Sequence, residues 1–143
     1  MVSKALQAAG ELGDKARQRL ERQKLAWLTT IARDGTPQPN PVWFIIDGEA
    51  IVVFSKPGQA KLHNIGRNGK VSFNLEATET EEEITIITGT AEVTDKSAIS
   101  ADLLDRYAAK YAEGMVAINL TREQYESQYS SVIRITPNKL RGW

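Results

Sequence analysis

The chain of 143 residues is long enough to bury a hydrophobic core, and 41% hydrophobic with 25% charged residues is ordinary for a globular protein. Its 18 Lys and Arg balance 18 Asp and Glu, so no overall positive field attracts nucleic acid, and the absence of cysteine excludes disulfides, thiolate zinc sites and a cysteine nucleophile. No apolar run is long enough for a membrane span, and the N-terminus lacks the apolar centre of a signal peptide. We therefore expect one domain, residues 1–143, in the cytoplasm.

The N-terminal segment, about residues 3–23, has the pattern of an amphipathic helix. Its apolar residues recur at helical spacing, at Ala5, Ala9, Leu12, Ala16 and Leu20. Because this face is rich in alanine, we expect the helix to pack on a surface or a partner rather than at the centre of the protein.

Three strands joined by tight turns are predicted after this helix. They are LAWLTTIA, VWFII and AIVVF, and the Asp34-Gly35 and Asp47-Gly48 pairs between them favour hairpin turns. Apolar residues occupy both faces of these strands, which predicts a sheet that is covered twice or closed on itself.

The next segment, FSKPGQAKLHNI at residues 54–65, predicts a short helix from about Pro57 to Ile65. Ser55 suits the N-cap, Pro57 the first turn, and Gly66 the C-terminal end of this helix.

The same segment is also a candidate anion site. The amides at a helix start carry the positive end of the helix dipole, and Gly58 lets a ligand approach the backbone. Lys56 and Lys61 add charge, and Gln59 adds a neutral donor. From these residues alone, helix capping with solvated lysines is an equally good interpretation.

The second half of the chain predicts two further strands, two helices and a last strand. Residues 71–75 alternate as a strand, and residues 84–93 change parity near Thr88-Gly89, which indicates a bulge. Amphipathic helices are predicted at about residues 99–111 and 121–129, before a final strand at 132–135. This order predicts an antiparallel α+β plan with a small barrel, not a βαβ series.

Side-chain catalysis has little support in the sequence. The one histidine, His63, lies mid-helix among lysines, so we interpret it as solvent-facing rather than as the base of a catalytic triad. No HxH, HExxH, GxGxxG or P-loop spacing is present. The acidic run 79–83 is typical of a solvated strand edge rather than of a metal site. An enzyme with this sequence needs a cofactor to supply its reactive group.

Two other stretches are candidates for ligand contact. Prolines 37, 39 and 41 cannot serve a central ladder, so their strand is an edge or splayed segment with backbone groups available to a planar heterocycle, next to the flat surface of Trp43. Taken alone, a strand start followed by a core tryptophan is the better interpretation. The terminal KLRGW either anchors the terminus or reaches into a site of a neighbouring subunit.

Taken together, LAWLTTIARDGTPQPNPVWF, FSKPGQAKLHNI, VSFNL and ITGTAEV resemble the split β-barrel family related to pyridoxamine 5′-phosphate oxidase. Within it they are similar to the flavin/deazaflavin oxidoreductases that use coenzyme F420. The resemblance covers the chain from about Leu20 to Trp143. It implies an α+β, mostly antiparallel split β-barrel (FMN-binding split barrel) with peripheral helices, assembled as a homodimer with two cofactors in grooves at the interface.

The resemblance also implies the residues of the groove. The cofactor phosphate would be held by Ser55, Lys56, Gln59 and Lys61, with Asn64 bracing the loop. The ring would be lined by Thr29, Thr30, Pro41, Val42 and Trp43, and Trp143 would close the groove from the other chain.

The function that this resemblance implies is hydride transfer between F420 and an unknown small organic substrate, with no obligatory catalytic side chain. The alternatives are an FMN-dependent oxidoreductase of the pyridoxamine-phosphate-oxidase type and a cofactor-binding split barrel without turnover. The polyglutamyl tail of F420 favours a broader basic path than FMN requires, for which Lys24, Arg33 and Lys70 are candidates.

Overall fold

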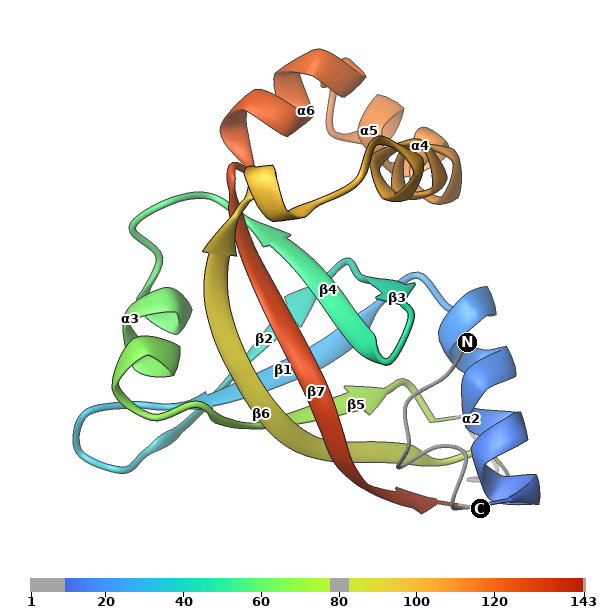
Figure 1. Cartoon of the computed structure of the whole chain (residues 1–143), viewed down its shortest axis with the longest axis vertical. Coiled ribbons are helices and arrows are strands. Elements are labelled where there is room, and N and C mark those ends of the chain that lie inside the picture. Colours follow the sequence, from blue (N-terminus) through green and yellow to red (C-terminus); the bar gives the residue numbers. More distant parts are fainter. Residues whose placement is uncertain (1–9, 78–82, 143) are drawn as a thin grey trace.

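The computed structural model describes residues 10–77 and 83–142, and a curved antiparallel sheet runs through its centre (Figure 1). Its strands are β1 (Ala26–Ile31), β2 (Pro37–Val42), β3 (Ile45–Asp47), β4 (Ala50–Ser55), β5 (Lys70–Leu75), β6 (Thr85–Asp95) and β7 (Ser131–Gly142). They are ordered β2-β1-β5-β6-β7-β4-β3, so β2 and β3, neighbours in the chain, form opposite edges. The sheet is not closed, which confirms the predicted split barrel.

Helices surround this sheet on several sides. They are α2 (Glu11–Arg22), α3 (Ala60–Arg67), α4 (Ala101–Lys110), α5 (Ala112–Ala117) and α6 (Arg122–Gln128), with a 3-10 turn η1 (Lys96–Ala98). Helices α4–α6 gather at one end of the sheet (Figure 1). Within the described ranges, no helix has the length and apolar character that crossing a membrane requires.

Helix α2 corrects one expectation about packing. The predicted residues 3–9 lie outside the described part of the chain, but Ala16 and Leu20 are fully buried in the core. Even an alanine-rich face excludes water well when it lies against large residues of a sheet, so α2 covers the barrel instead of lying loosely on its surface.

The prediction of VWFII as the second strand is wrong. Strand β2 instead contains the three prolines and ends at Val42, and β3 begins at Ile45. Because β2 is an edge strand paired only with β1, it needs hydrogen bonds on one side alone and tolerates proline. Trp43 and Phe44 carry the chain from one edge of the sheet to the other.

The helix predicted from Pro57 to Ile65 begins and ends later than expected. Gly58 has a φ of 78°, a left-handed conformation that holds Pro57-Gly58 in a turn, so α3 starts at Ala60 with Gln59 as its N-cap. Ser55 does not cap the helix, and its Oγ donates to the carbonyl of Lys56 at 2.9 Å. Gly66 lies inside α3, not at its end.

The last strand is longer than predicted and includes most of the C-terminal tail. Strand β7 pairs with β6 from Asp95↔Ser131 to Thr85↔Gly142, with a register shift between Thr88 and Gly89. This shift confirms the predicted bulge. The KLRG sequence is therefore part of the sheet.

Buried residues form two separate clusters. The barrel cluster fills the sheet interior and includes Leu28, Phe44, Phe73, Ile87 and Ile133. The cap cluster lies between the sheet and α4–α6 and includes Phe54, Leu103, Tyr107, Tyr111, Met115 and Tyr125.

Candidate functional site

A groove of about 390 Å³ lies at the edge of the cap cluster. We call it the cap groove, and it is lined by Pro41, Val42, Trp43, Phe54, Ser55, Lys56, Gln59, Lys61, Ile118, Tyr125 and Tyr129. Seven of the ten residues that the sequence proposed for a cofactor therefore line one cavity. Its volume is within the range of small-molecule sites.

One wall of the cap groove is formed by the end of β4 and the start of α3. Gln59 caps α3 without a side-chain hydrogen bond, which leaves the first amides of the helix for a ligand. Lys61, in the first turn of α3, is half-buried, and this burial lowers its pKa. Among the described residues no ion pair involves Lys56 or Lys61, so both ammonium groups lack a protein counter-charge.

The opposite wall is aromatic. Trp43 stacks on Tyr111 (ring centroids 4.6 Å apart, planes at 8°) and on Tyr125 (5.5 Å, 19°). Tyr125 in turn stacks on Tyr129 (4.1 Å, 11°). A side chain at Gly114 would approach the indole to 2.8 Å, so glycine gives Trp43 its space. Trp43 therefore fits both interpretations, because it packs in the cap cluster and also lines the groove.

Hydrogen bonds fix the tyrosines that support this wall. The Phe44 amide donates to the Tyr111 hydroxyl at 2.8 Å, and the Tyr107 and Tyr125 hydroxyls lie 2.6 Å apart. Burial raises the pKa of all three phenols above the ordinary value. They therefore stay neutral at physiological pH and hold their rings in place.

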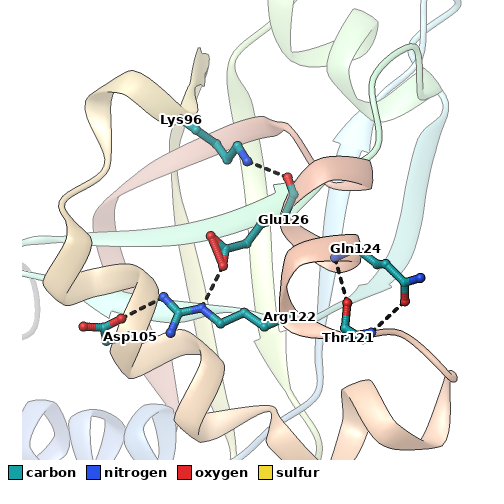
Figure 2. Close-up of polar contacts among 6 residues, drawn as sticks. All are labelled: Lys96, Asp105, Thr121, Arg122, Gln124 and Glu126. Carbon is teal, nitrogen blue, oxygen red and sulfur yellow. Dashed lines mark hydrogen bonds and ion pairs between the residues drawn. The ribbon is translucent and has the colours of Figure 1, made fainter.

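Polar contacts hold α6, the helix that carries Tyr125 (Figure 2). Arg122 bridges Asp105 of α4 at 2.7 Å and Glu126 of α6 at 2.8 Å. Lys96 donates to the carbonyl of Glu126 at 2.6 Å, and Thr121 starts the helix with a capping box. The aromatic wall is thus attached both to α4 and to the turn after β6.

Two of the proposed residues, Thr29 and Thr30, do not line the cap groove. Thr29 lies in a second hollow of about 470 Å³, which Lys70, Ser72, Thr88 and Asn138 also line. Thr30 is fully buried, and its Oγ1 accepts from Asn64 Nδ2 at 3.0 Å. Trp143 lies outside the described residues.

Asn64 and His63 both lie in α3. Asn64, expected to brace the loop, instead ties this helix to β2, since its Nδ2 also donates to Gln38 Oε1 at 2.8 Å. His63 is exposed on α3. It therefore has no buried partner from which a catalytic triad would be built.

Four groove residues were missed in the sequence, namely Phe54, Ile118, Tyr125 and Tyr129. Tyr125 and Tyr129 are four residues apart, which places both rings on one helix face, and this spacing was the available signal. Nothing local indicated that this face covers the end of β4.

Over residues 10–77 and 83–142 no group of three or more His, Asp or Glu is arranged to hold a metal ion. Of the acidic run 79–83, only Glu83 lies in the described part, and it pairs with Arg22 at 3.3 Å.

Comparisons with known proteins identify the family and the fold. Residues 12–143 match the model of the pyridoxamine 5′-phosphate oxidase family. No curated protein sequence matches the chain. Among solved structures, an F420 reductase is 22% identical with a TM-score of 0.69, covering 87% of this chain and 94% of its own. A FAD-binding protein from Mesorhizobium loti is 17% identical with a TM-score of 0.65, and the match covers 88% of this chain and 89% of that protein. The heme storage protein HutZ from Vibrio cholerae is 16% identical with a TM-score of 0.67, and the match covers 92% of this chain and 94% of HutZ. At these identities the structures show a shared fold.

Proposed function

The chain belongs to the pyridoxamine 5′-phosphate oxidase family, and from this premise we propose that it is an oxidoreductase that binds coenzyme F420 in the cap groove. The observation that carries the proposal is the groove itself. It joins a helix start without a side-chain cap on one wall to stacked aromatic rings on the other, and it holds two lysines that form no ion pair with a described residue. A phosphate-bearing planar cofactor needs both walls.

The residues of the groove fit such a cofactor by their chemistry. The amides at the start of α3, with Ser55, Gln59 and Lys61, offer donors to a phosphate. Pro41, with its exposed position on β2, and Trp43 offer apolar surface to a ring. When bound, a deazaflavin supplies hydride transfer, and this chain's residues orient it and exclude water from one face.

FMN is the second candidate cofactor, because one structural relative is described as FAD-binding and the phosphate wall suits either molecule. A binding protein without turnover is the candidate from another class. It is favoured by the lining of the groove, in which the described residues include no carboxylate and no histidine.

We also propose a homodimer in which the second hollow of one protomer faces the cap groove of the other. This arrangement would bring Thr29 and Lys70, which line the second hollow, toward the cofactor. Sedimentation equilibrium is expected to give the mass of two chains. A monomer at micromolar concentration would remove Thr29 from the proposed site.

The direct test of the function is an equilibrium titration of the full chain with F420 and with FMN, followed by cofactor fluorescence. The proposal predicts micromolar or tighter binding, with F420 preferred. Preference for FMN would move the protein to the second candidate. Failure of both cofactors to bind would reject the oxidoreductase proposal.

A further inference from the structure

The two lysines of the cap groove serve different walls. Lys61 belongs to the first turn of α3, whereas the Nζ of Lys56 lies over the ring of Tyr129, 5.5 Å from its centroid, on the α6 side. We propose that Lys61 binds the cofactor phosphate, while Lys56 and Tyr129 form a separate subsite for the carboxylate of a planar, conjugated acid. The inference deepens the proposed function and rests on it, because it names the substrate class.

The charge of the groove selects against cationic substrates. Lys56 and Lys61 are the charged side chains among its lining residues, and no described carboxylate pairs with either. Lys56 is exposed, and an exposed contact between an ammonium and an aromatic face is weak. Its ammonium can therefore turn from the Tyr129 ring to a carboxylate without losing a strong protein contact.

The shape of this subsite favours a flat molecule. Tyr129 is half-buried and stacks on Tyr125, which stacks on Trp43, so the plane of the outermost ring is set by the column behind it. Ile118, 44% exposed, adds an apolar edge to the same cavity. An unsaturated ring stacks on such a surface better than a puckered saturated one.

A monoanion suits Lys56 better than a phosphate does. Lys56 precedes α3 in the chain, its ammonium lies over the Tyr129 ring, and it offers a single charge to its ligand. The start of α3 offers several amides together with Lys61, which matches the higher charge and three oxygens of a phosphate. The phosphate of the cofactor would thus bind where several donors meet, and the carboxylate of the substrate would bind at the single charge of Lys56.

The test uses three probes and the full chain in calorimetric titrations. The probes are trans-cinnamate, its neutral amide cinnamide, and the saturated acid 3-cyclohexylpropionate. Each is titrated alone and in the presence of whichever cofactor binds. We expect the wild type to bind cinnamate about tenfold more tightly than cinnamide, the difference that one charge-assisted contact contributes. We also expect it to bind cinnamate more tightly than 3-cyclohexylpropionate, which keeps the carboxylate but lacks the planar ring that stacks on Tyr129.

Variants then assign the contact. Lys56→Met is expected to remove the preference for cinnamate over cinnamide and to leave cofactor affinity within about threefold of wild type, because the Lys56 ammonium lies over the Tyr129 ring and the phosphate is assigned to Lys61 and the start of α3. Lys61→Met is expected to weaken cofactor binding and to keep the preference for cinnamate over cinnamide. Tyr129→Leu should remove the preference for cinnamate over 3-cyclohexylpropionate. If both lysine variants lose affinity for the cofactor and for cinnamate to the same extent, the two lysines form one shared anion site and the inference is overturned.

The outcomes separate this inference from the proposed function. If F420 and FMN both fail to bind but cinnamate still depends on Lys56, the oxidoreductase proposal fails and the subsite stands. If a cofactor binds and Lys56→Met leaves the cinnamate preference intact, the function stands and the subsite is rejected. Lys56 is exposed, so its replacement is not expected to disturb folding.

Discussion

The barrel cluster and the cap cluster bury their residues in different ways. The barrel cluster is aliphatic apart from Phe44 and Phe73, which meet edge to face at 5.0 Å. The cap cluster instead contains the buried rings of Tyr107, Tyr111 and Tyr125, whose hydroxyls need hydrogen-bond partners.

The barrel cluster therefore contributes mainly to stability, whereas the cap cluster also forms the wall that contacts a ligand. The barrel interior is closed by sheet and helices, so its residues mainly exclude water. The cap cluster ends in an open face, because Trp43, Tyr125 and Tyr129 belong both to its aromatic column and to the cap groove. Directional bonds hold that open face in one arrangement, which a binding wall requires.

The largest expected effect breaks the barrel side of the comparison. Phe73 is fully buried in β5, and Phe73→Ala leaves a cavity that the surrounding sheet cannot fill. We expect the free energy of unfolding to fall by about 3–5 kcal/mol. Urea denaturation measures it, and a loss below about 1 kcal/mol would show that the interior is loosely packed.

A pair of glycine variants sharpens the comparison with a smaller effect. At Gly114 a new Cβ would lie 2.8 Å from the Trp43 indole, whereas at Gly66 of α3 nothing lies within 4 Å. Gly114→Ala should therefore destabilise by about 1–3 kcal/mol, and Gly66→Ala should stabilise by up to about 1 kcal/mol. Thermal unfolding followed by tryptophan fluorescence compares the two, and the same sign for both would contradict the proposed packing.

The third expected effect depends on pH and concerns the link between cap and barrel. Lys110 Nζ donates to the carbonyls of Leu20 and Phe44, yet burial, with a smaller effect of Lys24, lowers its pKa to about 8. Between this value and 10.5 the folded chain holds fewer protons than the unfolded chain, so this group's contribution to stability rises with pH across that window.

The control for that prediction is Lys110→Met. From about pH 8 to about pH 10, the unfolding free energy of the wild type should rise relative to that of the variant. A difference that stays constant over this range would show that Lys110 keeps its ordinary pKa. Comparing the two proteins removes the titration of the buried tyrosines, which both share.

Much of the fold followed from local patterns, but the site followed only in part. Proline placement predicted an edge strand, and the parity change predicted the bulge at Thr88 and Gly89. Thr29 and Thr30 are both expected at the ring, yet adjacent strand residues point to opposite faces. In the fold Thr29 lines the second hollow, while Thr30 is fully buried.

The aromatic wall of the cap groove could not be predicted, because it depends on a contact between distant parts of the chain. Tyr125 and Tyr129 reach the groove because α6 folds over the end of β4, a contact between residues about seventy positions apart. Local spacing showed that the two rings share a face but not what that face covers. The late start of α3 likewise depends on the positive φ of Gly58, which the Pro-Gly pair alone did not reveal.

The measurement that tests the central claim most directly is the cofactor affinity of Lys61→Met beside Lys15→Met. Lys61 lines the cap groove, whereas Lys15 is an exposed lysine of α2 that pairs with Glu11 at 3.6 Å. The account predicts that Lys61→Met weakens binding of F420 or FMN about tenfold or more and that Lys15→Met changes it by less than about twofold. Equal affinity in wild type and Lys61→Met would contradict the assignment of the cap groove as the cofactor site.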